Sequence, residues 1–276
     1  MRHKTPVGTD ADALAALFAG IALKAAVPIM EAYSRTVAAR FKADLSPVTE
    51  ADERAEEVIL AALAREAPGI PVVSEEAVSR GERPNVGAEY ILVDPLDGTR
   101  EFIARNGEFA VNIALVRDGA PICGAMYAPV AQRLWFAGGN AFGVDAKPGE
   151  NMPDAAHWRA LRTRQPLKSG LVALISRSHL DARSEALLDQ LAVIERRSMG
   201  SSIKFGVIAQ GDADLYPRFA PTMAWDIAAG DAILRAAGGM VLGEDGAPMR
   251  YHADATGYCN CGFVAWGTPS AAAADF

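Results

Sequence analysis

The fold is decided by the stretch YILVDPLDGTREF, residues 90–102. Its apolar start is typical of a buried strand, which is predicted to end at Asp94-Pro95, and a second carboxylate follows at Asp97. Pro95 keeps Asp94 extended, and Gly98 allows backbone angles that bring the main chain close to a ligand. The stretch therefore predicts two acidic side chains on one tight turn.

The same turn has the features of an anion site. A helical turn is predicted to begin near Gly98-Thr99, and its free backbone amides would form a corner that binds an anion. Asp, Pro and Gly are also common in surface turns, so this stretch alone is equally consistent with an ordinary turn.

A second acidic segment follows another short apolar run. In PVVSEEA, residues 71–77, Glu75 and Glu76 come directly after the predicted strand. If this strand neighbours the one ending at Asp94, several carboxylates converge at one sheet edge, where they need compensating charge. Because no Lys or Arg lies inside either segment before Arg100, a divalent cation is the simplest compensation, and oxygen ligands favour Mg²⁺ over zinc. Solvated loop carboxylates are the alternative.

Two further acids stand near predicted helix starts. Asp226 follows Trp225 at the beginning of a helix over 224–237, and Asp52 lies in SPVTEAD, at the start of a helix over 50–67. Each is also explained as a helix cap, although capping leaves a carboxylate free to point past the helix end.

The rest of the chain indicates layers of helix and sheet. A helix begins after Asp10, is kinked or ended by Pro28, and is predicted to resume over 29–41. Closely spaced β-rich runs then predict a largely antiparallel sheet, over 71–74, 90–94, 111–117, 122–128 and 133–138. Beyond a polar stretch at 149–165, strands over 171–176 and 213–217 alternate with helices over 183–192, 202–210 and 224–237. We place a boundary there, between domains 1–160 and 161–276.

Composition narrows the class of protein. Of the 276 residues, 50% are hydrophobic and 22% charged, which suits a globular protein with a substantial core. The net charge is 27 − 34 = −7, which argues against a nucleic-acid polymer as partner.

The apolar run Ala13–Leu23 has 11 residues, which predicts no transmembrane segment. Three cysteines, Cys123, Cys259 and Cys261, favour the cytoplasm over an oxidising compartment. Peripheral association with the inner membrane and the oligomeric state are left open.

The motifs in combination resemble a known family. VSEEA, DPLDGTREF and WDIAAG, in this order and spacing, are similar to the magnesium-dependent phosphatases of the inositol monophosphatase superfamily, which are sensitive to lithium. The resemblance extends from about Lys42 to Phe263 and implies an α/β (α+β) fold, a layered α/β/α/β/α sandwich. FKADLSPVTEAD, NGEFAVNIALV, GSSIKF and LYPRFAPTMAWD are more similar to the 3'(2'),5'-bisphosphate nucleotidases of bacterial sulfur metabolism. Leu45 stands where many relatives carry Asn, and Arg100-Glu101 replaces the Thr-Asn usual in inositol monophosphatases.

The resemblance implies the site residues. It assigns two or three Mg²⁺ ions to Glu75, Asp94, Asp97, Asp226 and the carbonyl of Leu96, with Glu76 as an outer partner or a ligand of an additional ion. Catalysis is expected from Glu75, Asp52 and Thr99, the last two positioning and deprotonating the attacking water. The substrate phosphate is expected to lie beside Glu75, Leu96, Asp97, Gly98, Thr99 and Asp226.

Substrate recognition is expected from the second half of the chain. The candidates are Ser176, Arg177, Ser178, His179, Ser201, Ser202, Lys204 and Arg218, each of which is also explained as surface, loop or core. The implied reaction is removal of the 3'-phosphate from 3'-phosphoadenosine 5'-phosphate, or from its 5'-phosphosulfate, to leave an adenosine 5'-monophosphate group. An inositol or sugar phosphatase is the nearest alternative, and a non-catalytic nucleotide-binding protein is a more distant one.

Overall fold

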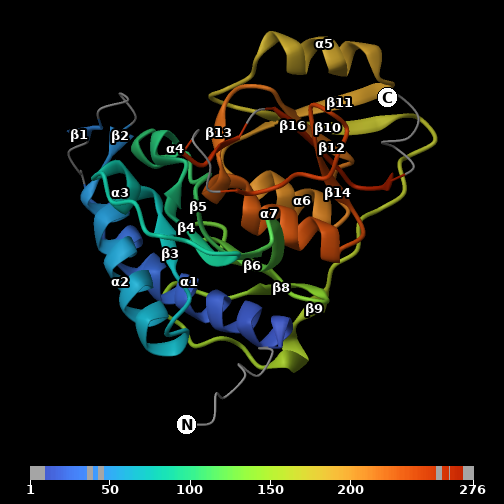
Figure 1. The fold of residues 1–276 in the computed structure, drawn as a ribbon. Helices are drawn as coiled ribbons and strands as arrows, with labels where there is room; N and C mark the ends of the chain where they lie inside the picture. The colour runs from blue at the N-terminus through green and yellow to red at the C-terminus, as the bar shows by residue number, and fades with distance from the viewer. Residues whose placement is uncertain (1–9, 36–39, 43–46, 253–256, 261, 270–276) are drawn as a thin grey trace.

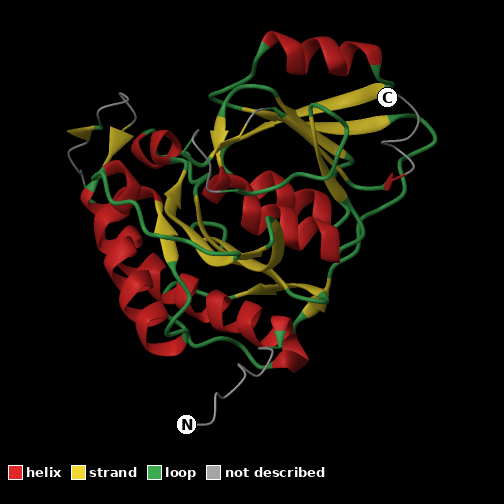
Figure 2. Cartoon of the chain, viewed as in Figure 1, coloured by secondary structure: helices red, strands yellow, loops and turns green. Residues whose placement is uncertain are grey.

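Helices and sheets alternate in five layers, as Figures 1 and 2 show. The computed structural model describes residues 10–35, 40–42, 47–252, 257–260 and 262–269. Helices α1 (Ala11–Tyr33) and α2 (Glu50–Glu66) cover one face of a seven-stranded sheet, and α6 (Ile203–Ala209) and α7 (Ala224–Ala236) lie on its other face. A five-stranded sheet follows, and α5 (Ala182–Gln190) covers its far side. The expected α/β/α/β/α sandwich is confirmed.

The first sheet is largely antiparallel, as predicted. Its order is β3-β4-β5-β6-β7-β8-β9, and only the pairing of β3 with β4 is parallel among these described strands. Ser74 at the end of β3 lies opposite Val93, so the carboxyl end of β3 lies beside Asp94. The strands are β3 (Val72–Ser74), β4 (Glu89–Asp97), β5 (Ala110–Arg117), β6 (Ala120–Ala128), β7 (Arg133–Ala137), β8 (Ala141–Asp145) and β9 (Arg159–Ala160).

Strand β4 is longer than predicted. It continues through Pro95 to Asp97, where the sequence had indicated an end at Asp94-Pro95. The register with β5 shifts between Asp94, opposite Asn112, and Asp97, opposite Ala110. Proline cannot donate to the ladder, but its φ suits an extended chain, so the strand passes through it as an irregularity. The irregularity keeps both carboxylates at the same end of the sheet.

The second sheet is mixed. Its order is β11-β10-β12-β16-β14, with β10 parallel to β11 and β12 and with β16 antiparallel to both of its neighbours. The strands are β10 (Leu171–Ser176), β11 (Val193–Met199), β12 (Leu215–Arg218), β14 (Met240–Gly243) and β16 (Phe263–Trp266). The short elements are α3 (Glu75–Ser79), α4 (Thr99–Ile103), the 3₁₀ turn Ala155–His157, and the pairs β1 (Arg40–Phe41) with β2 (Pro47–Val48) and β13 (Thr222–Met223) with β15 (Cys259–Asn260).

Helix α1 begins where predicted and ends earlier. The Asp10 carboxylate caps it by accepting from the Asp12 amide at 3.1 Å, and Pro28 lies inside the helix. The predicted continuation over 29–41 holds to Tyr33 and is wrong at Arg40–Phe41, which form β1, while residues 36–39 lie outside the described residues. Among the described residues α1 is also long and apolar enough to cross a membrane, contrary to the estimate that stopped at Lys24. Its most apolar window is 61% buried within the protein, and a core helix of a soluble protein passes the same test.

Helix α7 lies between the two sheets and directs Asp226 toward the first. A Cβ added to Gly124 on β6 would stand 2.9 Å from Ala229 Cα, so the helix and the sheet approach closely. One hydrophobic cluster joins residues of both sheets to α6 and α7, including Leu92, Phe205 and Ile233. The first sheet ends at Ala160 and the second begins at Leu171, near the predicted boundary, but the division into two domains stays a prediction.

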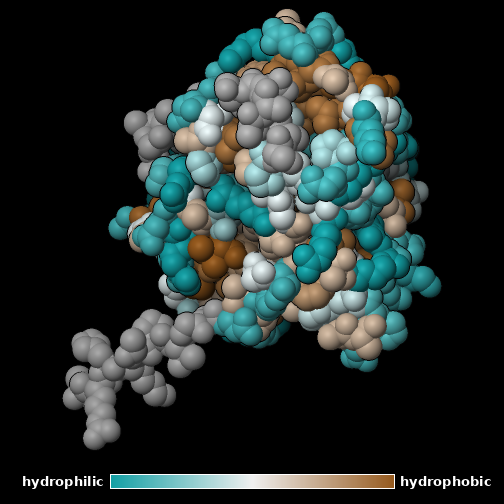
Figure 3. Space-filling model, turned by 90° about the vertical axis from the view of Figure 1, so that its right-hand side faces the viewer, coloured by the Kyte–Doolittle hydropathy of each residue, from teal (hydrophilic) through white to brown (hydrophobic). Residues whose placement is uncertain are grey.

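On the face drawn in Figure 3, hydrophilic residues alternate with small hydrophobic patches, and these patches do not merge into one large apolar area. Of the three cysteines, Cys123 is buried and Cys259 exposed, whereas Cys261, like Leu45, lies outside the described residues. The large apolar side chains that are exposed come from separate parts of the chain, namely Val27, Phe41, Ile103, Val130, Leu167, Leu180 and Ile194.

Candidate active site

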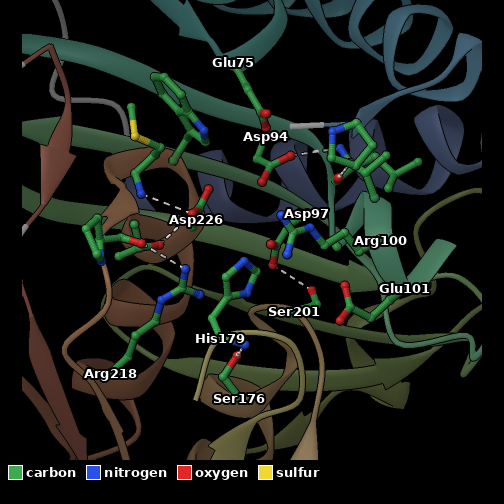
Figure 4. Close-up of a pocket in the computed structure, with 18 residues that line it drawn as sticks. Glu75, Asp94, Asp97, Arg100, Glu101, Ser176, His179, Ser201, Arg218 and Asp226 are labelled. Atoms are coloured by element: carbon green, nitrogen blue, oxygen red, sulfur yellow. Dashed lines mark hydrogen bonds between the residues drawn. The ribbon is translucent and has the colours of Figure 1, made fainter. Parts of the chain in front are cut away.

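Three carboxylates from separate elements meet at the edge of the first sheet (Figure 4). Glu75 is the first residue of α3, Asp94 lies on β4, and Asp226 lies in the first turn of α7. One oxygen of each lies within 4.8 Å of the others. The sequence predicted that Glu75 and Asp94 converge on the condition that β3 and β4 are neighbours, and they are. The third member, Asp226, was expected there only from the family resemblance.

A buried glutamate fixes the start of α3. Glu56 of α2 is 3% exposed, and its Oε1 accepts hydrogen bonds from the Ser74 hydroxyl and, at 3.0 Å, from the Ala77 amide. Its other oxygen accepts from Arg80 at 2.8 Å. Because the bonds tie α2 to both sides of Glu75, they set where the Glu75 side chain leaves the backbone.

Asp226 is both a helix-terminus residue and a member of the cluster. Helix α7 begins at Ala224, so Asp226 is its third residue, and its side chain caps the helix by accepting from the backbone of the N-cap residue Met223. Its Oδ2 accepts from the Thr222 hydroxyl at 2.6 Å and from the Met223 amide at 3.1 Å. The capping interpretation and the metal-ligand interpretation are therefore compatible, because these bonds use one carboxylate oxygen.

Asp97 lies beside the three clustered carboxylates. It lines the same pocket, and its Oδ2 accepts from the Ser201 hydroxyl at 2.6 Å and from the Ser202 amide. The carbonyl of Leu96, the other expected ligand, is 3.3 Å from the Thr99 hydroxyl oxygen. The ligand set implied by the resemblance stays a prediction, and its members all line one pocket.

The cluster is short of positive charge. Burial, opposed by Lys42 and reinforced by the charge of Glu76, raises the pKa of Glu75 to about 8. Burial, followed by the charge of Asp97, raises the pKa of Asp226 to about 6. Burial and the neighbouring carboxylates Glu75, Asp97 and Asp226 raise the pKa of Asp94 well above its usual range. Raised pKa values of this origin indicate a site that a further cation would stabilise.

Lys42 supplies compensation that the sequence argument missed. Its ammonium lies 2.6 Å from Glu75 Oε1 and 2.7 Å from Glu76 Oε1, and its side chain is 8% exposed. The inference that no protein cation compensates these acids is therefore wrong in part. It considered only cations inside the two acidic segments, and Lys42 reaches Glu75 from 33 residues away.

Thr99 and Asp52 form the expected pair. The Thr99 hydroxyl donates to Asp52 Oδ1 at 3.1 Å, while Asp52 Oδ2 accepts from the Thr49 amide at 2.8 Å and the Thr49 hydroxyl at 2.7 Å. Asp52 thus belongs to a capping box at the start of α2 and still reaches the site. It is 1% exposed, and burial raises its pKa, which makes it a better proton acceptor.

Gly98 carries a backbone conformation that the turn requires. Its φ of 95° lies in the left-handed region, and a Cβ there would stand 3.0 Å from the Glu108 carbonyl oxygen. Helix α4 begins at the next residue, so the predicted helical turn after Gly98 is confirmed.

The pocket has a volume of about 330 Å³ and brings together residues from both halves of the chain. Ser176, Ser201 and Arg218 line it with His179 and Arg100. Ser202 and Lys204 are not among the described residues that line it. Ser202 donates to Asn112 Oδ1 at 2.9 Å, and the Lys204 ammonium donates to the carbonyls of Met199, at 3.1 Å, and Ser201. Their direct contact with substrate stays a prediction.

A family comparison accounts for this geometry. The model of the family described as "Inositol monophosphatase family" matches residues 10–268. The chain belongs to that family. Membership places it among the phosphatases.

Individual relatives are similar to this chain within a narrower group than the whole family. The chain is 46% identical over 210 residues to a protein of Shigella flexneri named 3'(2'),5'-bisphosphate nucleotidase CysQ, covering 76% of this chain and 81% of that protein. The protein of the same name from Escherichia coli strain K12 is 45% identical over 211 residues, with the same coverage. The crystal structure of CysQ from Bacteroides thetaiotaomicron, 38% identical, has a TM-score of 0.77 and covers 92% of this chain and 97% of its own.

Proposed function

We propose that the protein is a Mg²⁺-dependent phosphatase that removes the 3'-phosphate of 3'-phosphoadenosine 5'-phosphate, or of its 5'-phosphosulfate. The observation that carries the chemistry is the three-carboxylate cluster facing one pocket with the Thr99–Asp52 hydrogen bond. The names of the similar nucleotidases support the choice of substrate.

The residues fit magnesium. Glu75, Asp94, Asp97, Asp226 and the Leu96 carbonyl offer oxygen donors only, which suits a hard divalent cation, and the raised pKa values of Glu75, Asp94 and Asp226 support a cation at this place. When bound, Mg²⁺ acidifies a water molecule and screens the charge that develops on the transferred phosphoryl group.

Thr99 and Asp52 handle the proton. The Thr99 hydroxyl already donates to Asp52 Oδ1, so its oxygen lone pair is free to accept a hydrogen bond from the attacking water. As the water loses its proton to the Thr99 oxygen, the Thr99 proton passes to Asp52, whose raised pKa favours accepting it. The amides at the start of α4 would bind the phosphate beside this pair.

The second half of the chain faces the rest of the substrate. Arg218 lines the pocket, and its guanidinium donates to the carbonyls of Pro221, at 3.1 Å, and Ala220, which leaves other N–H groups for a phosphate. Burial and the nearby charge of Arg218 lower the pKa of His179 to about 4, so this imidazole is neutral at pH 7. A neutral ring suits contact with a base or ribose better than with a phosphate.

The test is phosphate release by the purified protein with Mg²⁺. Equal low concentrations of 3'-phosphoadenosine 5'-phosphate, inositol 1-phosphate and fructose 1,6-bisphosphate are compared, with Asp94→Asn as a control for contaminating phosphatase. Preference for the adenosine compound, with AMP as product, is expected. Preference for inositol or the sugar would keep the metal site and overturn the substrate. Release from none of the three would favour a non-catalytic nucleotide-binding protein.

The place of action is a separate proposal. We propose that the enzyme acts in the cytoplasm, because its three cysteines are too few for a disulfide framework. Fractionation of cells is the test, and recovery with the inner membrane that salt reverses would indicate peripheral association.

A further inference from the structure

The turn Gly200–Ser202, which joins β11 to α6, is held by two carboxylates from the first half of the chain, Asp97 at the end of β4 and Glu108 on the loop before β5. Glu108 Oε2 accepts from the Gly200 amide at 2.7 Å, and Asp97 Oδ2 accepts from the Ser201 hydroxyl at 2.6 Å and from the Ser202 amide. Ser201 has a φ of 58°, a region that non-glycine residues rarely adopt. Such a conformation persists where surrounding contacts over-determine it. These three hydrogen bonds are contacts of that kind.

The two halves of the chain pack closely against each other at this turn. A Cβ added to Gly200 would stand 2.5 Å from Glu101 Cγ and 3.0 Å from the Glu108 carbonyl oxygen. The Glu101 carboxylate also accepts from the Ser178 hydroxyl, so the loop after β10 is tied to the same place. Because Gly200 packs this closely against Glu101 and Glu108, a small displacement of Glu108 also displaces the backbone of the Gly200–Ser202 turn.

Arg177 fixes the Glu108 carboxylate. Its Nε and Nη2 donate to the two oxygens of Glu108 at 2.7 and 2.8 Å, and Nη2 also donates to the Ser198 carbonyl at 3.0 Å. The Arg177 side chain is 42% exposed, so the pair contributes little to stability by itself. Its paired, planar geometry instead fixes the direction of the Glu108 oxygens toward the Gly200 amide.

We propose that Glu108 and Arg177 are positioning residues that set the Gly200–Ser202 turn and, through its two hydrogen bonds, the orientation of the Asp97 carboxylate. The proposal rests on the proposed function, in which Asp97 is a metal ligand. Loss of a group that hydrogen-bonds a metal-binding carboxylate commonly weakens metal binding by roughly 10- to 100-fold. Arg177 accordingly acts through Glu108, and it is not an anchor for the substrate phosphate.

The experiment measures Mg²⁺ binding to the metal-free protein by calorimetry, without substrate. Glu108→Ala and Arg177→Ala are each expected to weaken Mg²⁺ binding about tenfold or more. The double variant is expected to be no weaker than Glu108→Ala, because the two residues act in one chain of contacts. Glu108→Gln keeps an acceptor for the Gly200 amide and is expected to restore most of the Mg²⁺ affinity. Together with Arg177→Ala, this variant tests the proposal if Glu108→Ala does not fold.

The chain provides a matched control. Arg197 and Glu195 on β11 form another paired ion pair, at 2.7 and 2.8 Å, with exposures of 42% and 48%. Glu195→Ala is expected to leave Mg²⁺ binding and turnover unchanged, which separates the proposed role from a general effect of losing a surface ion pair.

The outcomes separate two kinds of failure. If the unaltered protein binds Mg²⁺ and Glu108→Ala binds it equally well, or if the two alanine substitutions have independent effects, the positioning role is wrong and the proposed function stands. If Arg177→Ala raises only the KM for the nucleotide, Arg177 is a phosphate ligand. If the unaltered protein binds no Mg²⁺, the proposed function itself fails.

Discussion

The two walls of the pocket differ in how their charges are satisfied. On the wall made by the first sheet and α7, Glu75, Asp94 and Asp226 lie together with raised pKa values, and Lys42 compensates only the glutamate side. On the basic wall, made by the second half, Arg218 donates to backbone carbonyls, and two further cations of that half that do not line the pocket are also satisfied, Arg177 by Glu108 and Lys204 by backbone carbonyls. The acidic wall has carboxylates that a cation would compensate, whereas these cations of the second half already have hydrogen-bond partners.

The largest expected effect lies on the acidic wall, at its proton-transfer pair. Thr99→Val removes the hydroxyl without altering the capping box of Asp52, and kcat is expected to fall roughly 10²- to 10⁴-fold. Mg²⁺ affinity is expected to change little. Thr99→Ser, which keeps a hydroxyl, should retain much of the activity. Steady-state kinetics and calorimetry measure both quantities, and an equal loss in the serine variant would remove the hydroxyl from the mechanism.

A neutral isostere of Asp94 separates function from stability. Asp94→Asn is expected to lower turnover by roughly 10² or more through loss of a ligand. In metal-free protein the same change is expected to raise Tm by about 2–4 °C for each kcal/mol of relieved repulsion. Asp214, also buried but paired with Arg164 at 2.8 Å, is the matched control, and Asp214→Asn should lower Tm. A lower Tm in both variants would mean that the acidic wall is not short of charge.

Substitution on the basic wall is expected to affect binding. Arg218→Ala should raise KM for the nucleotide roughly 10- to 100-fold, as for a hydrogen bond to a charged group, with kcat on small phosphomonoesters nearly unchanged. Arg183, which stacks over the Phe219 ring at 4.5 Å and does not line the pocket, is the control. An equal loss on every substrate would place Arg218 in the chemical step.

The sequence predicted the acidic wall better than the basic one. Glu75 and Asp94 stand at the ends of short apolar runs, and that pattern is visible locally in residues 71–102. Contacts between distant segments have no such signal, so Lys42 on Glu75 and Arg177 on Glu108 were not predicted. We did not predict strand β11 because five of its residues are exposed. Most of these five are charged or polar, so the sequence shows no alternation of apolar and polar residues there. Strands β8, β14 and β16 were missed because each is short and lies near glycines.

Metal is expected to raise thermal stability because Asp226 joins the second half of the chain to the first. Mg²⁺ at about 100 times its Kd adds about 2.7 kcal/mol, or roughly 5–10 °C in Tm for a chain of this size. Scanning calorimetry with Mg²⁺ and with a chelator measures the shift. The shift should shrink in Asp226→Asn, and an equal shift in that variant would mean that the metal does not bridge the halves.

The smallest expected effect is the pH dependence of the metal-free protein. Burial raises the pKa of Glu75 from its ordinary value of 4.5 to about 8 in the folded protein, so the folded state holds the extra proton between these values. Stability from this group is therefore present below pH 4.5 and is lost as pH rises toward 8. Thermal melts from pH 6 to 9 should show a falling Tm that Glu75→Gln flattens. A Tm that is independent of pH would show that Lys42 already compensates Glu75 fully.

The position of Asp226 on α7 also has a consequence for synthesis of the chain. Glu75 and Asp94 lie on neighbouring elements of the first sheet, whereas the third carboxylate comes 226 − 94 = 132 residues after Asp94. A nascent chain that has completed the first sheet on the ribosome thus holds two of the three clustered carboxylates and cannot complete the cluster. Strand β16, translated still later, inserts between β12 and β14 and completes the sheet behind α7. The three-carboxylate cluster is therefore assembled only after α7 and the strands around it have been synthesised.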